Sequence, residues 1–259
     1  MMKNVYIIIG LALFGCTSNS KRTDVSSNES DYQYSASIKQ DLQLYDSLSK
    51  DKQTKFDYGL LESNLVDVQS LNKHIMIDIK YATKDNFMHQ RLYKRIDRAF
   101  LQKDVAVRLA NCQDYLTALD ASLHLLVYDA VRPVSVQWEM WKALDSIPEK
   151  DRVKFVSNPI NRSVHNYGAA VDLTICNSKG EPLDMGANFD DIRKIAYPSL
   201  ESHFLSTGEL TKNQIANRDL LRKVMRSEGF RNIPTEWWHF NACSRKEAKL
   251  KYIFLENEP

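Results

Sequence analysis

The spacing of hydrophobic residues along this chain predicts both strands and helices. Isoleucines alternate with other residues over 75–79, and this period of two is typical of a half-buried strand. Apolar residues then recur at intervals of three and four over 101–119, which predicts a long helix leading into a second strand over 123–128. Two tryptophans and a leucine at helical spacing indicate a further helix after Pro133.

The second half of the chain continues this mixture of elements. An apolar run over 168–175 predicts a buried strand, and a last core strand is expected over 237–240. Between them, Thr211 and Gln214 match a capping box that opens a helix ending at Gly229. Strands and helices do not alternate strictly enough for a wound parallel sheet, so the pattern favours an α+β fold.

The first residues have the pattern of an export signal. Lys3 precedes an apolar run over 5–14 that is too short to cross a bilayer as a helix. The Leu-Phe-Gly-Cys tetrad that ends at Cys16 resembles a bacterial lipobox, in which the cysteine is lipidated and becomes the mature N-terminus. The alternative is a plain secretory signal in which Cys16 has no role. Either pattern predicts an exported protein of the bacterial cell envelope, and a lipid on Cys16 would hold it at a membrane on the periplasmic or outer-membrane side.

The polar residues that follow divide the chain into regions. Residues 17–37 are rich in Ser, Asn, Asp and Lys with few aliphatic residues, a composition that is typical of a solvated tether. A short amphipathic helix is expected over 38–48, and the folded domain is expected to begin near Asn64. We therefore predict a lipoprotein signal peptide over 1–15, a tether and N-terminal extension over 16–63, and one folded, catalytic domain over 64–259.

Composition and charge restrict the function. A chain of 259 residues that is 43% hydrophobic can bury the core of one large domain. Its formal net charge of +2 produces no overall field that would recruit nucleic acid or an anionic membrane surface. The function must therefore come from a specific site.

The cysteines are expected to be structural. If Cys16 carries a lipid, then Cys112, Cys176 and Cys243 remain, and an odd number cannot all pair within one chain. Each lies beside an apolar segment, which favours a buried hydrophobic role over a redox or metal role. One disulfide is compatible with an oxidising compartment, and the pair stays open.

Polar residues of the kind that bind metals interrupt three apolar segments. These segments are 163–172, 236–239 and 129–133. Burying such groups is costly unless they are hydrogen-bonded or bind a metal. His165 and Asp172 would lie about 23 Å apart in an extended chain at ~3.3 Å per residue, so the chain must bend at Asn166-Tyr167-Gly168 if both are to bind one ion. Two imidazoles and one carboxylate, with a fourth position left for water, form a catalytic zinc set.

Glu236 is the candidate general base. It lies three residues before His239, so the two side chains would face opposite sides of a regular strand. We therefore expect Glu236 on a turn near Ile233-Pro234-Thr235. A carboxylate beside the metal can take a proton from the attacking water and later deliver it to the leaving amine.

Each of these residues also has an ordinary interpretation. A single histidine on an apolar segment is usually a hydrogen-bonded core residue, and Glu-Trp-Trp-His alone is weak evidence. The combination is harder to explain in that way. The remaining histidines lack such neighbours and are expected to be structural or surface residues: His74, His89, His124 and His203.

Together these motifs resemble a family, the VanX-type D-alanyl-D-alanine dipeptidases, within the zinc D,D-peptidases related to the hedgehog signalling domain. The pattern Ser-x-His-x-x-Gly-x-Ala-x-Asp is matched over 163–172, and Glu-x-x-His is matched over 236–239. The similarity extends from the Asp-Ile-Lys-Tyr-Ala-Thr segment at 78–83 to about Asn241. The resemblance implies a hedgehog-like α+β fold with a central, mainly antiparallel sheet and flanking helices.

The resemblance also implies roles for individual residues. It implies one zinc ion on His165, Asp172 and His239, with Glu236 as the base and Arg132 directed at the scissile carbonyl. A guanidinium there would stabilise the negative charge that develops on the carbonyl oxygen. The alternative for Arg132 is a solvated arginine at the start of a helix.

The substrate residues implied by the family are Ser163 and Asp190, which would bind the ammonium of a free amino terminus. For Asp190 the alternative is a loop aspartate that caps a helix. One departure concerns Met88 and His89, which stand where the family commonly has smaller residues. This difference leaves the shape of the substrate entrance open.

Three functions are compatible with the sequence. The first is hydrolysis of the D-alanyl-D-alanine dipeptide in cell-wall metabolism, salvage or glycopeptide resistance. The second is a D,D-carboxypeptidase or peptidoglycan endopeptidase of the same fold, whose relatives typically carry proline where this chain has Trp237. The third is a non-catalytic wall-binding protein, which would have lost the base or the arginine, whereas both are present here.

Overall fold

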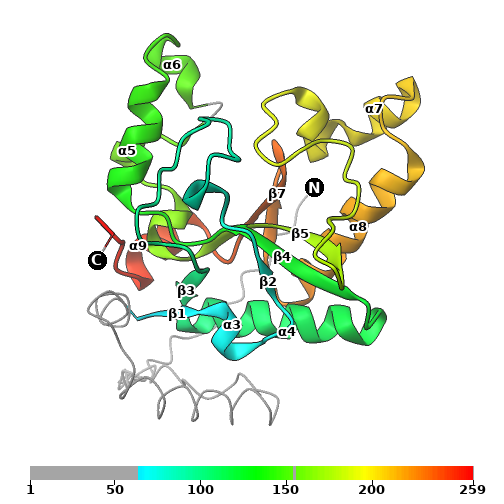
Figure 1. The fold of residues 1–259 in the computed structure, drawn as a ribbon. Helices are drawn as coiled ribbons and strands as arrows, with labels where there is room; N and C mark the ends of the chain where they lie inside the picture. Colours follow the sequence, from blue (N-terminus) through cyan, green and yellow to red (C-terminus); the bar gives the residue numbers. More distant parts are fainter. Residues whose placement is uncertain (1–63, 154–155, 259) are drawn as a thin grey trace, which may run out of the picture. The chain divides into compact units, whose positions relative to one another are not determined.

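The computed structural model describes residues 64–153 and 156–258, which belong to one compact unit spanning Ser35–Pro259 (Figure 1). The expected lipidation site at Cys16 and the expected helix over 38–48 lie outside the described residues. No helix in the described part of the chain is both long enough and apolar enough to cross a bilayer.

A five-stranded sheet forms the centre of the described unit (Figure 1). In spatial order its strands are β2 (Met76–Ile77), β4 (Leu123–Asp129), β5 (Ala170–Asn177), β7 (Glu236–Asn241) and β6 (Arg231–Ile233). Only the β2–β4 pair is parallel, and the other three pairs are antiparallel. The predicted α+β fold with a mainly antiparallel sheet is therefore confirmed.

Some strand boundaries differ from the prediction. The expected strand over 75–79 is reduced to two residues in β2, and Leu101 belongs to a strand, β3 (Phe100–Gln102), rather than to the helix that follows. β3 pairs with β1 (Leu65–Asp67) in a separate two-stranded sheet. Periodicity did not reveal these short strands because a run of three residues is too short for its period to be recognised.

The two long helices of the described residues lie where the sequence predicts them, the first from its apolar spacing and the second from its capping box. α4 spans Lys103–Leu119 and α8 spans Lys212–Ser227, opened by the predicted capping box in which Thr211 Oγ1 accepts a hydrogen bond from Gln214 N at 3.2 Å. The predicted helix after Pro133 is α5 (Val134–Ala143). Within residues 64–153 and 156–258, the shorter helices are α3 (Val68–Leu71), α6 (Glu149–Arg152), α7 (Glu201–Thr207) and α9 (Arg245–Lys251). The 3-10 turns of the same residues are η1 (Lys80–Ala82), η2 (Pro159–Asn161), η3 (Val164–Tyr167), η4 (Lys194–Ala196) and η5 (Pro198–Leu200).

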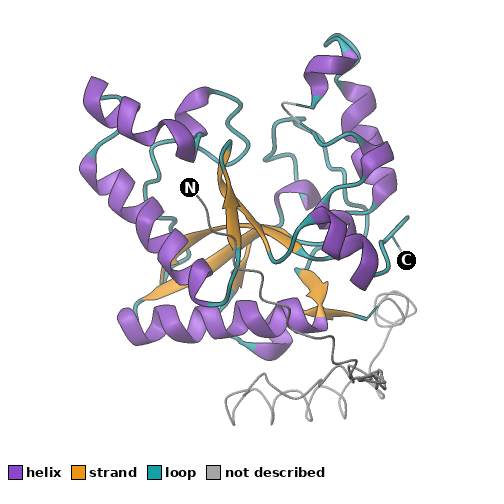
Figure 2. Cartoon of the chain, turned by 180° about the vertical axis from the view of Figure 1, so that it is seen from behind, coloured by secondary structure: helices purple, strands orange, loops and turns teal. Residues whose placement is uncertain are grey.

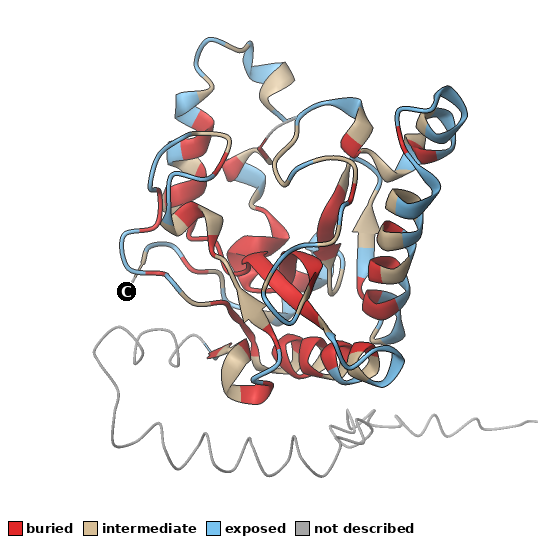
Figure 3. Ribbon diagram, turned by 45° about the vertical axis from the view of Figure 1, so that its right-hand side comes forward, coloured by how far each residue is buried: buried red, intermediate tan, exposed pale blue. Residues whose placement is uncertain are grey.

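The core lies between the sheet and the helices α4 and α8, which contact each other (Figures 2 and 3). The apolar face of α4 is fully buried at Val105, Leu109, Cys112 and Leu116. Each buried valine or leucine of this face contributes about 1.5–3 kcal/mol when it is removed from water. α4 packs against β4 and α8 packs against β5, and the candidate ligands lie on or beside these strands.

Two of the three described cysteines are buried as expected, and the remaining histidines are structural or surface residues as expected. The described thiols are free, with Cys112 and Cys176 buried and Cys243 half-buried. His124 stacks on His74 with ring centroids 5.9 Å apart. His89 and His203 are exposed.

Candidate metal centre and active site

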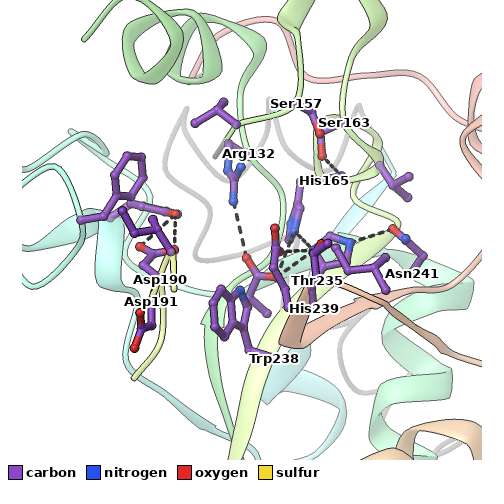
Figure 4. A pocket seen from close by; sticks show the side chains of 18 of the residues that line it. Arg132, Ser157, Ser163, His165, Asp190, Asp191, Thr235, Trp238, His239 and Asn241 are labelled. Carbon is purple, nitrogen blue, oxygen red and sulfur yellow. Dashed lines mark hydrogen bonds and ion pairs between the residues drawn. The ribbon is translucent and has the colours of Figure 1, made fainter. Parts of the chain in front are cut away.

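Three ligand atoms from distant parts of the chain meet above the sheet. Asp172 on β5 pairs directly with His239 on β7, and side chains of directly paired residues lie on the same face of a sheet. His239 Nδ1 is 2.9 Å from Asp172 Oδ1, and His165 Nε2 lies 3.1 Å from His239 Nδ1 and 3.3 Å from Asp172 Oδ1 (Figure 4). All three residues are buried, and they form a group able to hold one metal ion.

A tight turn brings His165 to this position, as the sequence predicts. His165 lies on η3, where Ser163 Oγ accepts a hydrogen bond from His165 N at 3.3 Å and Asn166 Oδ1 accepts one from Ser163 N at 2.6 Å. Gly168 ends the turn with φ at +62°, a left-handed conformation that favours glycine. A Cβ there would also lie 2.5 Å from Leu65 Cδ2. The chain therefore reverses between His165 and Asp172.

The hydrogen bonds of the two imidazoles leave a lone pair on each facing nitrogen. The Ala130 carbonyl can only accept, so the proton of His165 is on Nδ1, which donates to it at 2.6 Å. His239 Nε2 likewise donates to Asn241 Oδ1 at 3.0 Å. In the neutral imidazoles, the lone pairs on His165 Nε2 and His239 Nδ1 and the oxygen of Asp172 thus face one another. A zinc ion with four ligands at 2.0–2.1 Å holds them about 3.3 Å apart, so the donor types and spacing fit zinc.

Electrostatics in the centre favour a cation. Burial works to raise the pKa of Asp172, but His165 and His239 lower it to well below its ordinary range. For His239, burial works to lower the pKa, and the Asp172 carboxylate outweighs burial and raises it. The carboxylate therefore stays ionised at neutral pH and contributes a negative charge to the site.

Arg132 lies beside these ligands, held by a carboxylate that sequence reasoning did not assign. Arg132 Nε and Nη2 donate to Asp129 Oδ2 at 3.0 and 2.7 Å, and Nη2 lies 3.5 Å from Asp172 Oδ2. Asp129 is completely buried and also accepts from the Tyr93 hydroxyl at 2.6 Å. Burial by itself would lower the pKa of Arg132. The negative charge of Asp129 outweighs burial and raises this pKa well above its ordinary value, so the guanidinium stays charged. The sequence feature that could have indicated the role of Asp129 is an aspartate at the end of an apolar strand.

Glu236 lies at the rim of the same pocket. It is the first residue of β7, directly after the turn at Pro234–Thr235, so it begins a strand rather than lying on the turn itself. Glu236 Oε2 is 3.8 Å from His239 Nδ1. Burial raises the pKa of Glu236 above its ordinary value, the direction that suits a general base working near neutral pH.

An irregularity in the sheet explains how Glu236 and His239 approach the same site. Successive residues of β6 pair with Phe240 and then with Glu236, so that 237–239 have no counterpart on β6. Such a bulge breaks the alternation of a regular strand. The spacing of three therefore does not separate the two side chains, as a regular strand would have required.

The Ser163 and Asp190 side chains both line the pocket, on opposite sides of Arg132 in Figure 4. The Tyr81 hydroxyl donates to Asp190 at 3.1 Å, and the Tyr81 ring lies 5.1 Å from the Arg132 guanidinium carbon. Burial, and then the charge of Asp172, raises the pKa of Asp190 well above its ordinary value. Tyr81 belongs to the segment at 78–83 that resembles the family, but no role was predicted for it. The sequence feature that could have indicated its role is a tyrosine within a polar segment.

Comparison with known proteins identifies the family. Residues 61–255 match the Peptidase_M15 family, described as D-ala-D-ala dipeptidase. The D-alanyl-D-alanine dipeptidase of Escherichia coli (strain K12) is 34% identical over 178 residues, covering 69% of this chain and 84% of that protein. The dipeptidase of Enterococcus faecalis (strain ATCC 700802 / V583) is 29% identical over 195 residues, covering 70% and 92%.

Among solved structures, the LdcB LD-carboxypeptidase is 18% identical, with a TM-score of 0.38 and coverage of 73% of this chain and 72% of that chain.

The match of the family over most of the chain and the similarity to its curated members agree with the buried His-Asp-His group. The chain belongs to the Peptidase_M15 family of D-alanyl-D-alanine dipeptidases, which are zinc peptidases.

Proposed function

We propose that this chain hydrolyses the dipeptide D-alanyl-D-alanine to two D-alanines, with one zinc ion bound by His165, Asp172 and His239. The observation that carries the proposal is the meeting of these three ligand atoms, within 4.8 Å of one another, in the pocket that Glu236 and Arg132 also line. Zinc, when bound, supplies Lewis acidity and lowers the pKa of a water molecule.

The residues of the chain divide the remaining chemistry between them. Glu236 accepts a proton from the attacking water and delivers it to the leaving amino group. Arg132, held in place by Asp129, stabilises the negative charge that develops on the carbonyl oxygen. Because this guanidinium is already oriented in the free enzyme, little reorganisation accompanies the reaction.

Asp190 supplies the counter-charge for the substrate ammonium. Ser163, which also lines the pocket, is the second residue proposed to bind this ammonium. A buried carboxylate without a cation is costly, which the raised pKa of Asp190 reflects. A free amino terminus would provide that cation. The site therefore favours a dipeptide over a peptide that is extended on its amino side.

The carboxypeptidase alternative is disfavoured by Trp237. Its indole Nε1 donates to Ala187 O at 3.1 Å and so ties the segment that carries Asp190 to β7. Proline, typical of carboxypeptidase relatives at this position, has no such donor. The non-catalytic alternative is disfavoured because Glu236 and Arg132 are both present in the pocket.

For the location of the enzyme, the proposal is export and lipidation at Cys16. The support is the apolar run over 5–14 and the lipobox-like tetrad ending at Cys16. Labelled fatty acid should enter the wild-type protein and not a Cys16→Ser variant. Equal labelling of both would place the anchor elsewhere.

The decisive experiment measures zinc content and hydrolysis together. We expect one zinc per chain, loss of activity with a chelator and recovery when zinc is added. D-Ala-D-Ala should be cleaved faster than N-acetyl-D-Ala-D-Ala or a pentapeptide ending in D-Ala-D-Ala. Faster cleavage of the pentapeptide would establish the carboxypeptidase instead, and zinc binding without any hydrolysis would establish the non-catalytic protein.

A further inference from the structure

The bulge interrupts the ladder between β6 and β7, and one side chain bonds backbone carbonyls at its two ends. Residues 237–239 have no counterpart on β6. Asn232 Nδ2 donates to Glu236 O and to His239 O, both at 2.8 Å, with a longer contact of 3.4 Å to Trp237 O. One amide group thus closes both ends of the bulge.

The two carbonyls bound by Asn232 belong to the proposed base and to a proposed metal ligand. The Glu236 and His239 side chains must converge on one site although three residues separate them, and the bulge makes this convergence possible. Any change in the bulge would therefore rotate one side chain relative to the other. On the β6 side the ladder is interrupted and does not resist such a change, whereas on the other side, of residues 237–239, only His239 is paired, with Asp172 of β5.

The amide of Asn232 is oriented toward the bulge. The other end of the same amide, Asn232 Oδ1, is buried and has no hydrogen-bond partner among the described residues. A buried acceptor without a partner is unfavourable. The side chain is thus held by its Nδ2 group, which donates to the carbonyls at the two ends of the bulge.

We propose that Asn232 is a positioning residue that sets the relative orientation of Glu236 and His239 by bonding the backbone carbonyls at the two ends of the bulge. The inference rests on the proposed function, since it names the residue that aligns the base with the metal ligand. Asn232 does not touch the reacting atoms and is not itself catalytic.

The test compares Asn232→Ala with a matched control, Asn72→Ala. Asn72 is a buried asparagine that, like Asn232, donates to a backbone carbonyl, Ala110 O at 3.2 Å, but it links α3 to α4 away from the site. Each variant is measured for Tm, for the zinc affinity of the metal-free protein in competition with a chelator, and for kcat and KM on D-Ala-D-Ala.

We expect both variants to lose Tm, and only Asn232→Ala to lose about 10- to 100-fold in zinc affinity or kcat, as is usual when a group that orients metal ligands is removed. KM should change less than kcat. The inference is overturned if Asn232→Ala changes zinc affinity and kcat by no more than Asn72→Ala does.

A second variant keeps the test decisive if Asn232→Ala does not fold. Asn232→Asp has the same shape but replaces the donating amide by a carboxylate, and it should show the same or larger losses of zinc affinity and kcat. Wild-type levels of both in a folded Asn232→Asp protein would also overturn the inference. Failure of the wild type to cleave D-Ala-D-Ala would instead contradict the proposed function, and the zinc affinities would still decide the role of Asn232.

Discussion

Replacing Asp190 by Asn tests whether its charge selects substrates with a free amino terminus. The substitution keeps the shape of the side chain and an oxygen that can accept from the Tyr81 hydroxyl. It also suits the backbone, because Asp190 has φ at +59° and Asn is one of the few residues that tolerate this conformation. Only the negative charge is removed.

The expected loss follows from the strength of one charged hydrogen bond. Such a bond contributes about 1.5–3 kcal/mol, and ~1.4 kcal/mol corresponds to a tenfold change in rate. We therefore expect kcat/KM for D-Ala-D-Ala to fall roughly 10- to 150-fold in Asp190→Asn. N-acetyl-D-Ala-D-Ala, which has no ammonium, should be affected far less, so the preference for the free dipeptide should shrink by the same factor.

The neighbouring residue provides the control. Asp191 also lines the pocket, but its carboxylate is paired with Arg193 at 2.6 Å. Asp191→Asn removes a charge from the same segment and should leave the ratio of the two substrates unchanged. The reasoning would be refuted if Asp190→Asn lowered kcat/KM equally for both substrates, or if Asp191→Asn changed the ratio as much.

The same substitution has a consequence for stability. The folded-state pKa of Asp190 is raised by burial, so its ionisation costs stability, and this cost grows as the pH rises from the unfolded pKa through the folded pKa. Asp190→Asn removes this loss of stability, because an asparagine side chain does not ionise. The metal-free variant should therefore have a Tm at pH 7 no lower than that of the wild type, in contrast to a variant that disrupts packing.

Three further substitutions test other parts of the site. Glu236→Gln should keep zinc by elemental analysis but lose about 100- to 10,000-fold in kcat, and loss of zinc in proportion to activity would make Glu236 a ligand instead. Asp129→Asn should lower the free energy of unfolding in urea by about 3–5 kcal/mol, because it breaks a buried ion pair with Arg132, whereas an unchanged urea midpoint would show that the pair contributes little. Gly168→Ala should destabilise the fold by at least ~1–2 kcal/mol, because its φ of +62° is unfavourable for alanine and the added Cβ would contact Leu65, and wild-type thermal stability would contradict this account of the turn.

Much of the fold and the identity of the candidate ligands could be predicted from the sequence. The helix α4 follows from the spacing of its apolar residues, because it is long enough to show its period and to bury one face. The start of α8 follows from the capping box of Thr211 and Gln214. His165, Asp172 and His239 were recognisable because polar residues interrupt apolar runs at the spacing of a known motif. These signals are local, so they are present in the sequence itself.

The tertiary structure alone decided how these residues meet and what supports them. Asp172 and His239 are 67 residues apart, and only the register of β5 against β7 places them opposite each other. Asp129 and Tyr93 likewise meet through the packing of segments 36 residues apart. No periodicity encodes such pairings, because they depend on which strands become neighbours.

The approach of Glu236 to His239 shows the same limit most directly. A spacing of three in a regular strand predicts opposite faces, and the prediction of a turn at Glu236 was the closest that local reasoning came. The structure instead uses a bulge in β7, covered by Asn232 on the neighbouring strand. The sequence by itself thus determined which residues could form the site, whereas strand pairing and the bulge decided their geometry, because both depend on contacts between segments and not on the order of residues within one.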